Sequence, residues 1–275
     1  MKIKFLGTAA AEGVPAIGCR CEVCKRSRAV GGRNMRSRSQ ALIDGELLIE
    51  FNPDTLWHSH MHGFDLSEID HCLITHSHPD HLYTDDIDNY RRDFCHGRDR
   101  SMNFYAAEDG YNKIKEVSLR PHMGGTVTPH LVEAGKTFTV GMYRVMPLRA
   151  HHTAETSPVF YSISRGGKKI LYAHDTGYFP EDTWEILKGE GRFDLISLDC
   201  TGCLGLDGHN YVRHMTFPVC LDVIARMENM GLIDEKTVRV VNHFSHNGGQ
   251  TYDEMCKEAD KHGVIVSYDG LEIEF

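Results

Sequence analysis

Four side chains that can bind a metal ion lie within six residues of this chain: His76, His78, Asp80 and His81. Imidazole and carboxylate groups suit zinc, manganese and iron. On an extended segment His76 and His78 point the same way, so both can hold one ion. Asp80 and His81 follow Pro79, and its turn directs them towards a second ion. Metallohydrolases use two neighbouring cations in this way: the cations polarise the substrate and hold a hydroxide between them.

More residues of ligand type follow apolar runs in the second half of the chain. His151 and His152 are adjacent at an expected strand end, so only one of them can point into a cleft. Asp175 can bridge two cations through its two oxygens, although a turn cap is the structural alternative. His243 is nearest to its strand and suits the same cleft, which leaves His246 to bind elsewhere. These later ligands argue against the alternative that the first motif is a histidine-rich surface loop.

A cluster of thiols, Cys19, Cys21 and Cys24, forms a second candidate metal site among the nine cysteines of the chain. The odd cysteine number indicates reduced thiols, some of them binding metal. Such crowding disfavours disulfides within the cluster and favours one tetrahedral metal, for which a fourth ligand must come from elsewhere. Reactive redox cysteines are the alternative. We interpret Cys200 and Cys203, which follow a buried-looking strand, as structural.

The composition is that of a soluble globular protein, with 41% hydrophobic and 25% charged residues in 275 positions. Apolar runs are shorter than the roughly 18 residues that span a membrane, so we expect no membrane association. The N-terminal segment lacks the apolar core of a signal peptide, and we expect a cytoplasmic protein. The net charge of −9 argues against general nucleic-acid binding. It does not exclude a phosphorylated substrate, because bound cations invert the local charge.

Short apolar runs alternate with helical stretches, which predicts an α/β fold. The expected strands are Lys2–Leu6, Ala41–Ile43, Glu46–Asn52, His71–Thr75, Asn103–Ala106, Lys136–Leu148 (as two strands), Val159–Ser164, Lys169–Ala173, Asp194–Asp199, Arg239–Asn242, Val264–Tyr268 and Leu271–Phe275. The expected helices are Asp80–Phe94, Tyr111–Val117, Glu181–Lys188, Phe217–Met230 and Tyr252–Lys261. Because ligand-type residues follow several of these strands, we expect the strand ends to converge on one cleft.

The motif from His76 to His81, a later histidine, Asp175 and a final histidine together resemble the metallo-β-lactamase-fold hydrolases. The likeness extends from the segment that begins at Phe5 to the one that ends at Gly270. It implies a four-layer αβ/βα sandwich over residues 1–275 as a single domain. It also implies a binuclear metal site at the edge between two sheets.

A narrower resemblance combines the cysteine cluster with the segment His243-Phe244-Ser245-His246 and indicates the branch of PhnP-like phosphodiesterases. It implies three metal sites. One active-site ion is bound by His76, His78, His152 and Asp175, and the second by Asp80, His81, Asp175 and His243. A structural zinc is bound by Cys19, Cys21, Cys24 and His246, at a small loop at 18–26. The active-site metals are expected to be manganese or zinc, with iron as a further option. His152 is preferred to His151 because it matches the pattern of similar sequences.

The same resemblance implies that His214 contacts phosphate and passes a proton to the leaving group, and that Asp80 also serves catalysis. A structural place before the following helix is the alternative for His214. Asp44, Glu50 and Asp54 can orient ligand imidazoles, but carboxylates near strands usually face solvent.

We therefore predict a metal-dependent hydrolase that cleaves a small phosphodiester, with a cyclic diester as one option, by a metal-bridged hydroxide. A PqqB-like biosynthetic protein and an RNA-processing nuclease on the same fold are the alternatives. The segment after His81 and the spacing from His214 to His243 depart from the PhnP-like pattern, so the substrate stays open. We expect a small phosphorylated substrate as the partner, and a homodimer is an open alternative.

Overall fold

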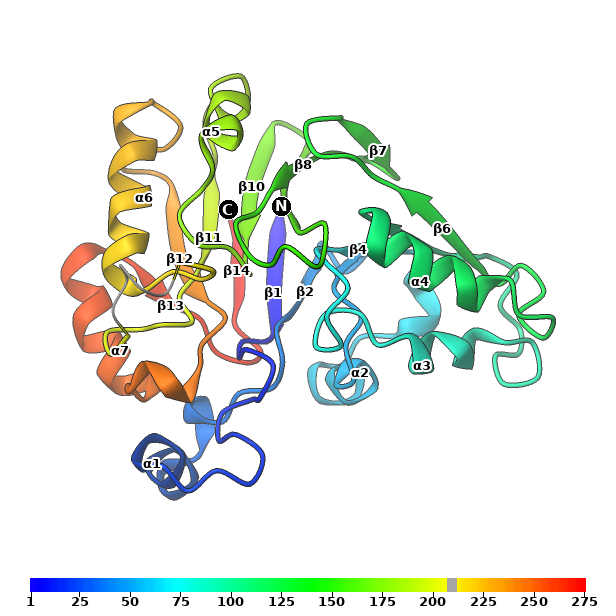
Figure 1. The fold of residues 1–275 in the computed structure, drawn as a ribbon, viewed down its shortest axis with the longest axis horizontal. Coiled ribbons are helices and arrows are strands. Elements are labelled where there is room, and N and C mark those ends of the chain that lie inside the picture. The colour runs from blue at the N-terminus through cyan, green and yellow to red at the C-terminus, as the bar shows by residue number, and fades with distance from the viewer. Residues whose placement is uncertain (207–211) are drawn as a thin grey trace.

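The computed structural model describes residues 1–206 and 212–275, and within them the chain forms two seven-stranded sheets (Figure 1). In spatial order the first sheet consists of β14 (Glu272–Glu274), β1 (Lys2–Gly7), β2 (Gln40–Ile43), β3 (Leu47–Ile49), β4 (His71–Ile74), β5 (Met102–Ala106) and β6 (Val127–Leu131). The second consists of β13 (Ile265–Val266), β12 (Val238–Asn242), β11 (Leu195–Asp199), β10 (Lys168–Ala173), β9 (Val159–Arg165), β8 (Tyr143–Arg149) and β7 (Phe138–Val140).

The two sheets pack face to face through an apolar layer to which both contribute. Ile3 and Phe5 of the first sheet share this layer with Tyr161, Ile163 and Ile170 of the second, and all five side chains are fully buried. Alternate strand residues point to opposite sides, so each sheet needs a second cover on its outer face.

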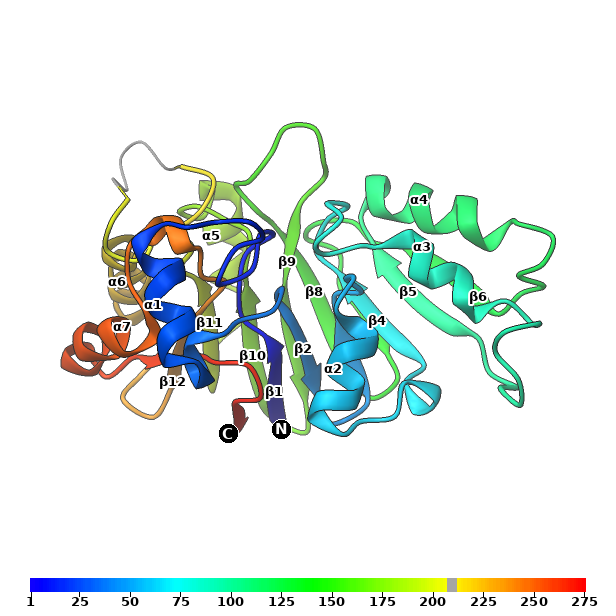
Figure 2. The ribbon, with the colours of Figure 1, turned by 90° about the horizontal axis from the view of Figure 1, so that it is seen from below.

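Helices supply the outer covers, which makes the structure a four-layer sandwich. On the first sheet lie α2 (Thr55–His62), α3 (Thr84–Ile87) and α4 (Glu108–Ser118), and on the second lie α5 (Glu181–Leu187), α6 (Phe217–Asn229) and α7 (Tyr252–Ala259) (Figures 1 and 2). The expected αβ/βα architecture is therefore confirmed. No helix in the described part of the chain is long and apolar enough to cross a membrane.

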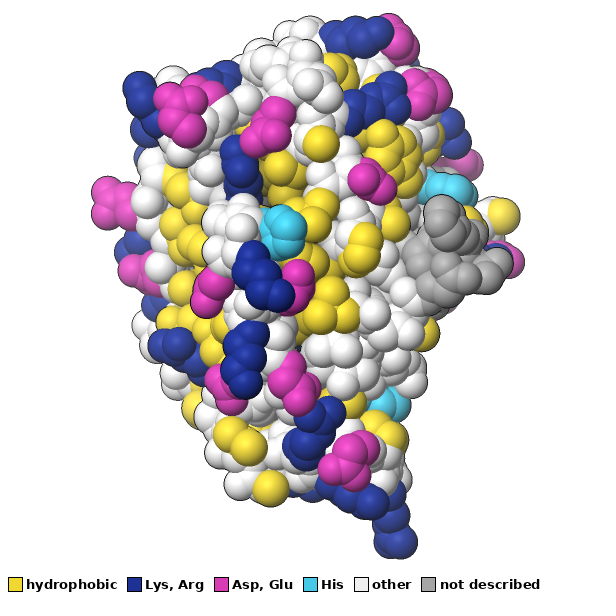
Figure 3. Space-filling view, turned by 90° about the vertical axis from the view of Figure 1, so that its left-hand side faces the viewer, with side chains coloured by type: hydrophobic (Ala, Val, Ile, Leu, Met, Phe, Trp, Pro, Cys, Tyr) yellow, Lys and Arg dark blue, Asp and Glu magenta, His cyan; other side chains and the backbone are white. Residues whose placement is uncertain are grey.

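Helix α6 illustrates how local sequence sets an element. Thr216 precedes it in an extended conformation, Pro218 fits its first turn, and Gly231 follows its end with a φ of +69°. Its buried face includes Val223 and Met227, four residues apart. On this side of the molecule basic and acidic side chains are interspersed, and no continuous basic face is visible in Figure 3.

The expected helix Asp80–Phe94 forms only in part, at 84–90. After the turn at His78, the N–H of Phe51 donates to the carbonyl of His81 at 2.8 Å, and the N–H of Tyr83 donates to the carbonyl of Phe51 at 2.7 Å. This bridge holds the backbone extended, so that only the short α3 and a 3₁₀ turn at Asp88–Tyr90 follow.

Sequence reasoning also missed α1 (Glu22–Val30) and the edge strand β6. Pro129 in β6 argues against a central strand but is tolerated at a sheet edge. The remaining 3₁₀ turns are Gly32–Asn34, Leu66–Glu68, His246–Gly248 and Asp260–His262.

Candidate active site

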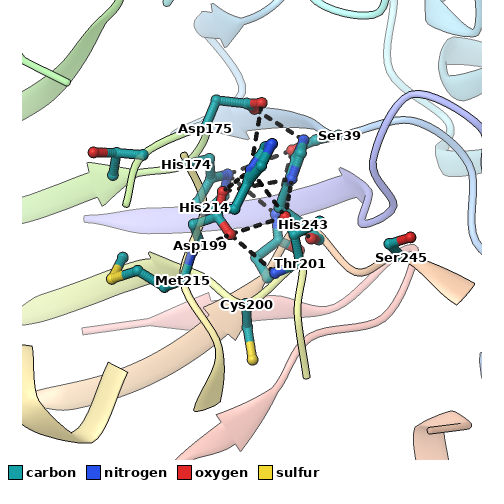
Figure 4. A network of polar contacts seen from close by, with 12 residues as sticks. Ser39, His174, Asp175, Asp199, Cys200, Thr201, His214, Met215, His243 and Ser245 are labelled. Atoms are coloured by element: carbon teal, nitrogen blue, oxygen red, sulfur yellow. Dashed lines mark hydrogen bonds and ion pairs between the residues drawn. The ribbon is translucent and has the colours of Figure 1, made fainter. Parts of the chain in front are cut away.

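The ends of parallel strands bring the candidate residues together. Strands β10, β11 and β12 are parallel neighbours in which Leu198 pairs with both Ala173 and Val241. Asp175, Asp199 and His243, which end or follow these strands, therefore emerge at one edge of the second sheet (Figure 4). The motif after β4 meets them from the first sheet.

His76, His78 and His152 form the first candidate group, and their ligand atoms lie within 4.8 Å of one another. Nε2 of His76 is 2.8 Å from Nδ1 of His78, which is 3.4 Å from Nε2 of His152. Nε2 of His152 is also 3.7 Å from Oδ1 of Asp175. The structure places His152 in this group, whereas His151 is exposed. Burial lowers the pKa of His152 and holds the pKa of His76 well below its usual value, which favours the neutral imidazole that binds metal.

Asp80, His81 and His243 form the second candidate group. Nε2 of His81 lies 3.1 Å from Oδ2 of Asp80, and both His81 Nε2 and His243 Nε2 lie 2.9 Å from Oδ2 of Asp175. Asp175 thus faces both groups, as the bridging interpretation requires. Asp175 and His243 adopt left-handed backbone conformations, with φ of 52° and 64°, and such strain is typical of functional positions.

Imidazoles and carboxylates are buried together at this centre, where burial disfavours their charged forms and their mutual attraction favours them. Burial alone lowers the pKa of His81, but the carboxylates of Asp175, Asp80 and Glu50 outweigh burial and raise it well above its usual value. Burial likewise opposes the imidazolium form of His243, yet Asp175 raises its pKa to about 9. Burial disfavours the Asp175 carboxylate, but His243 and His81 hold its pKa well below the usual range. The metal-free centre therefore balances imidazolium against carboxylate.

Unpartnered polar atoms test whether this centre fits metal ions. Nε2 of His81, Nε2 of His243 and Oδ2 of Asp175 are buried and form no hydrogen bond of acceptable geometry within the described residues. Buried polar atoms are normally satisfied, so their convergence on one point needs an explanation. A cation accounts for it, because these nitrogen and oxygen donors are the ones that zinc, manganese and iron accept. The second group therefore fits a divalent cation, and the three imidazoles of the first group offer donors of the same kind.

Glu50 contacts His81 of the second group on the ring nitrogen opposite to the one that faces Asp175. It is fully buried, and its Oε1 lies 3.1 Å from Nδ1 of His81, while its Oε2 accepts the N–H of Thr75 at 3.3 Å. The expectation that carboxylates near strands face solvent is wrong for Glu50. Asp54 instead pairs with Arg38.

His214 lies beside both groups and is held by Asp199, to which the sequence assigned no specific role. Nδ1 of His214 is 2.8 Å from Oδ2 of Asp199 and 4.0 Å from Oδ1 of Asp175 (Figure 4). The hydroxyl of Thr201 donates to Oδ1 of Asp199 at 2.8 Å and lies 2.8 Å from Nδ1 of His243. Burial lowers the pKa of His214, but Asp199 outweighs it and raises that pKa. The only sequence signal for Asp199 was a polar residue that ends a buried strand.

The thiol cluster is a separate candidate site. The ligand atoms of Cys19, Cys21, Cys24 and His246 lie within 4.8 Å of one another, and Nδ1 of His246 is 3.3 Å from the Cys21 sulfur. Helix α1 begins at Glu22, so the expected loop at 18–26 ends in the first turns of this helix. The N–H of Cys24 lowers the pKa of Cys21 to about 6, whereas burial raises that of Cys24 to about 11. Three sulfurs and one imidazole suit a tetrahedral zinc.

Comparison with known proteins identifies the class. A family model described as "Beta-lactamase superfamily domain" matches residues 47–234, which is more than half of the chain. The chain therefore belongs to this family and is a metallo-β-lactamase-superfamily hydrolase, as the motif predicted.

One curated relative and several solved structures resemble this chain. It is 30% identical over 291 aligned positions to an octanoyltransferase of Porphyromonas gingivalis. That alignment covers 99% of this chain but 51% of the relative, so the chain spans about half the length of the curated relative it matches.

The structural neighbours share the fold. A diphosphatase from the PhnP family has a TM-score of 0.74, 23% identity and coverage of 100% of this chain and 98% of its own. Zn(2+)-bound PqqB from Methylobacterium extorquens has a TM-score of 0.75, 20% identity and complete coverage of both chains at 100%. The short form of human tRNase Z has a TM-score of 0.66 and 17% identity, and covers 100% of this chain and 99% of its own.

Proposed function

We propose that this protein hydrolyses a small phosphodiester, cyclic diesters included, at a centre of two divalent cations. The observation that carries the proposal is the position of Asp175, whose Oδ2 lies 2.9 Å from Nε2 of both His81 and His243 while its Oδ1 faces His152. One cation would be held by His76, His78 and His152. The other would be held by Asp80, His81 and His243, and Asp175 would contribute to both. When bound, such cations concentrate positive charge at a phosphoryl group and favour the attack of water on phosphorus.

His214 is the proposed proton donor to the leaving oxygen. Asp199 stabilises its imidazolium form, and the His214 ring centre lies 4.8 Å from that of His152, so the proton is held beside the ligand cluster. A positioned general acid contributes about 10²- to 10⁴-fold to a rate. The PhnP-family diphosphatase is a neighbour whose name describes action on phosphate groups, which supports this substrate class.

An acyl ester or thioester is a second candidate substrate. The name of the Porphyromonas relative refers to octanoyl transfer. Beside His152, a cavity of about 930 Å³ has an apolar wall that includes Leu131, Val132 and Val159. Such a wall suits a short acyl chain as well as the organic part of a diester.

We further propose manganese or zinc as the active-site metal, with iron as a further option, and a structural zinc at the thiol cluster. Free thiols favour a reducing compartment, so we place the activity in the cytoplasm. With a net charge of −9 we propose no general nucleic-acid binding and no membrane partner. Residues 1–275 would act as one domain, and a homodimer is an open alternative.

A substrate panel tests the proposal. The apo protein is reloaded with manganese, zinc or iron and assayed with bis(p-nitrophenyl) phosphate, p-nitrophenyl phosphate, a β-lactam, a precursor tRNA and an octanoyl thioester. We expect the diester to be preferred, and Asp175→Ala to abolish its hydrolysis. Asp222→Asn, which changes an exposed carboxylate on α6, is the control and should keep activity.

Three outcomes would contradict the proposal. Diester hydrolysis that survives Asp175→Ala would exclude this centre. Preference for the thioester or the precursor tRNA would assign the alternative substrate. Full metal loading without any hydrolysis would favour a biosynthetic role such as that of the PqqB alternative.

A further inference from the structure

The first turn of α4 lies against both loops that carry the ligands of the first cation. One loop contains Ser77, which stands between His76 and His78 in the sequence. The other follows β8, carries His152 and ends near Ser157. These loops are far apart in the sequence, yet Nε2 of His152 in one loop lies 3.4 Å from Nδ1 of His78 in the other.

A single carboxylate joins the two loops. The N–H of Ser77 donates to Oδ2 of Asp109 at 3.2 Å, and the N–H of Ser157 donates to Oδ1 of Asp109 at 3.0 Å. One turn further along α4, Nζ of Lys113 donates to the carbonyl oxygen of Ser77 at 2.7 Å. Both backbone polar groups of Ser77 are therefore bound by side chains of one helix face.

The helix that carries Asp109 is itself fixed to the first sheet. A Cβ at Gly110 would lie 3.0 Å from Cβ of Ala106 and 3.8 Å from Cγ2 of Ile74, so glycine lets α4 approach the strands closely. Ile114 and Val117 are buried further along the same helix. Asp109 is thus presented from a rigid element and not from a third loop.

We propose that Asp109 is a positioning residue that holds the two ligand loops in register, and that it sets the affinity of the His76–His78–His152 site for its cation. The inference rests on the proposed metal centre. Without the carboxylate, each loop must be ordered separately when the cation binds, and that ordering weakens binding. Groups that orient metal ligands from outside typically change metal affinity by about 10- to 100-fold.

Metal binding provides a test that does not depend on turnover. Apo protein and variants are titrated with cobalt(II) and zinc(II) against a competing chelator, and the metal content is counted. Cobalt at the thiol cluster gives sulfur-to-metal charge-transfer bands, and cobalt at the histidine sites does not, so the thiol cluster is followed separately. The number of bound ions shows how many of the two histidine sites stay filled.

In Asp109→Asn the amide places N–H donors opposite a backbone N–H, so we expect one histidine-type site to weaken by about 10- to 100-fold. The second histidine site and the thiol cluster should keep their affinity. Lys113→Met, an exposed position that loses only the bond to the Ser77 carbonyl, should weaken the same site less and guards against misfolding of the first variant. Glu116→Gln, which neutralises an exposed carboxylate on the same helix, is the matched control.

Unchanged cobalt affinity in both Asp109→Asn and Lys113→Met would overturn the proposal. Equal weakening of all three sites, with a lower Tm of the apo protein, would also overturn it, because that result indicates a general structural role. A failed substrate panel leaves this titration unaffected. If Asp109→Asn lost one site selectively while the metal-loaded wild type hydrolysed no diester, the proposed function would be contradicted and the role of Asp109 would still be supported.

Discussion

At the scale of single residues, the pair of Asp199 and His214 decides when the proposed proton donor is charged. Asp199 is fully buried, and burial disfavours its carboxylate, yet His214 keeps its pKa below the usual value. In return the carboxylate raises the pKa of His214 against the effect of burial. A general acid acts while it is protonated, so activity should persist below this raised pKa and fall as the pH rises through it.

Asp199→Asn should move the basic limb of the pH profile of kcat/KM to lower pH, because loss of the negative charge lets burial lower the pKa of His214. A shift of about one pH unit corresponds to about 1.4 kcal/mol of lost charge stabilisation. The measurement is diester hydrolysis by the metal-loaded protein from pH 6 to 10, with Asp222→Asn as the control. A basic limb that stays in place would remove Asp199 and His214 from the proton transfer.

Glu12 is the residue that we expect to hold the zinc-ligating form of His246. The Ser245 hydroxyl donates to Oε1 of Glu12 at 2.5 Å, and Nε2 of His246 lies 3.8 Å from the same oxygen. Nδ1 of His246 faces the thiols, so a carboxylate on the opposite nitrogen favours the required tautomer. Glu12→Gln should therefore speed zinc loss to a chelator about 10-fold, while the exposed Glu22→Gln should not. Equal rates in both variants would contradict this role.

The residues that the sequence identified most directly are those whose spacing is itself a signal. His76, His78, Asp80 and His81 stand in one short motif, and the three cysteines of the thiol cluster stand in another. Asp199, Glu50 and Asp109 carry no such signal, because each contacts a partner from a different strand or loop. Such contacts are created by sheet register and helix packing, which local periodicity does not encode.

At the scale of elements, most strands were predictable because buried strands are short apolar runs. The failure at Asp80–Phe94 has a tertiary cause. Phe51 pairs with the backbone beside His81 and prevents the helix that local propensity favours. The same pairing places Asp80 and His81 at the centre, so the error in secondary structure occurs where the site is built.

A backbone contact between two connecting segments provides a test at this scale. A Cβ at Gly177 would overlap the carbonyl oxygen of Val212, two residues before His214. Gly177→Ala should therefore displace His214, lower diester activity and destabilise the protein by about 1–3 kcal/mol. Gly189→Ala is the control, because its Cβ would lie at an ordinary 3.5 Å from the Ile186 carbonyl. Urea unfolding and initial rates measure both effects, and wild-type values for Gly177→Ala would contradict the contact.

At the scale of the whole molecule, the fold joins charged ligands from both sheets at one buried centre. The second sheet contributes Asp175 and His243 and the first contributes Asp80 and His81, so the centre exists only when the two sheets are packed together. Protonation of the centre is therefore linked to the stability of the sandwich.

The apo protein should lose stability as the pH rises from about 6.5 to about 9. Asp175 raises the pKa of His243 from 6.5 to about 9, against the effect of burial. A group with a raised pKa contributes stability that is complete below its unfolded pKa and is lost as the pH rises through the folded value. For His243 the contribution is on the order of 1–3 kcal/mol. Scanning calorimetry of the metal-free protein should thus show Tm falling across this window.

The metal-loaded protein should not show this fall, because a cation binds the neutral imidazole and takes over the interaction with Asp175. Manganese or zinc should therefore raise Tm more at pH 9 than at pH 6, since protons compete with the cation at the lower pH. His243→Gln removes one of the titrating groups and should make the dependence of the apo protein shallower, while His81, whose pKa is also raised, keeps its contribution. If Tm of the apo wild type were constant or rose between pH 6.5 and 9, His243 and Asp175 would not form the charged pair that the proposed cations replace.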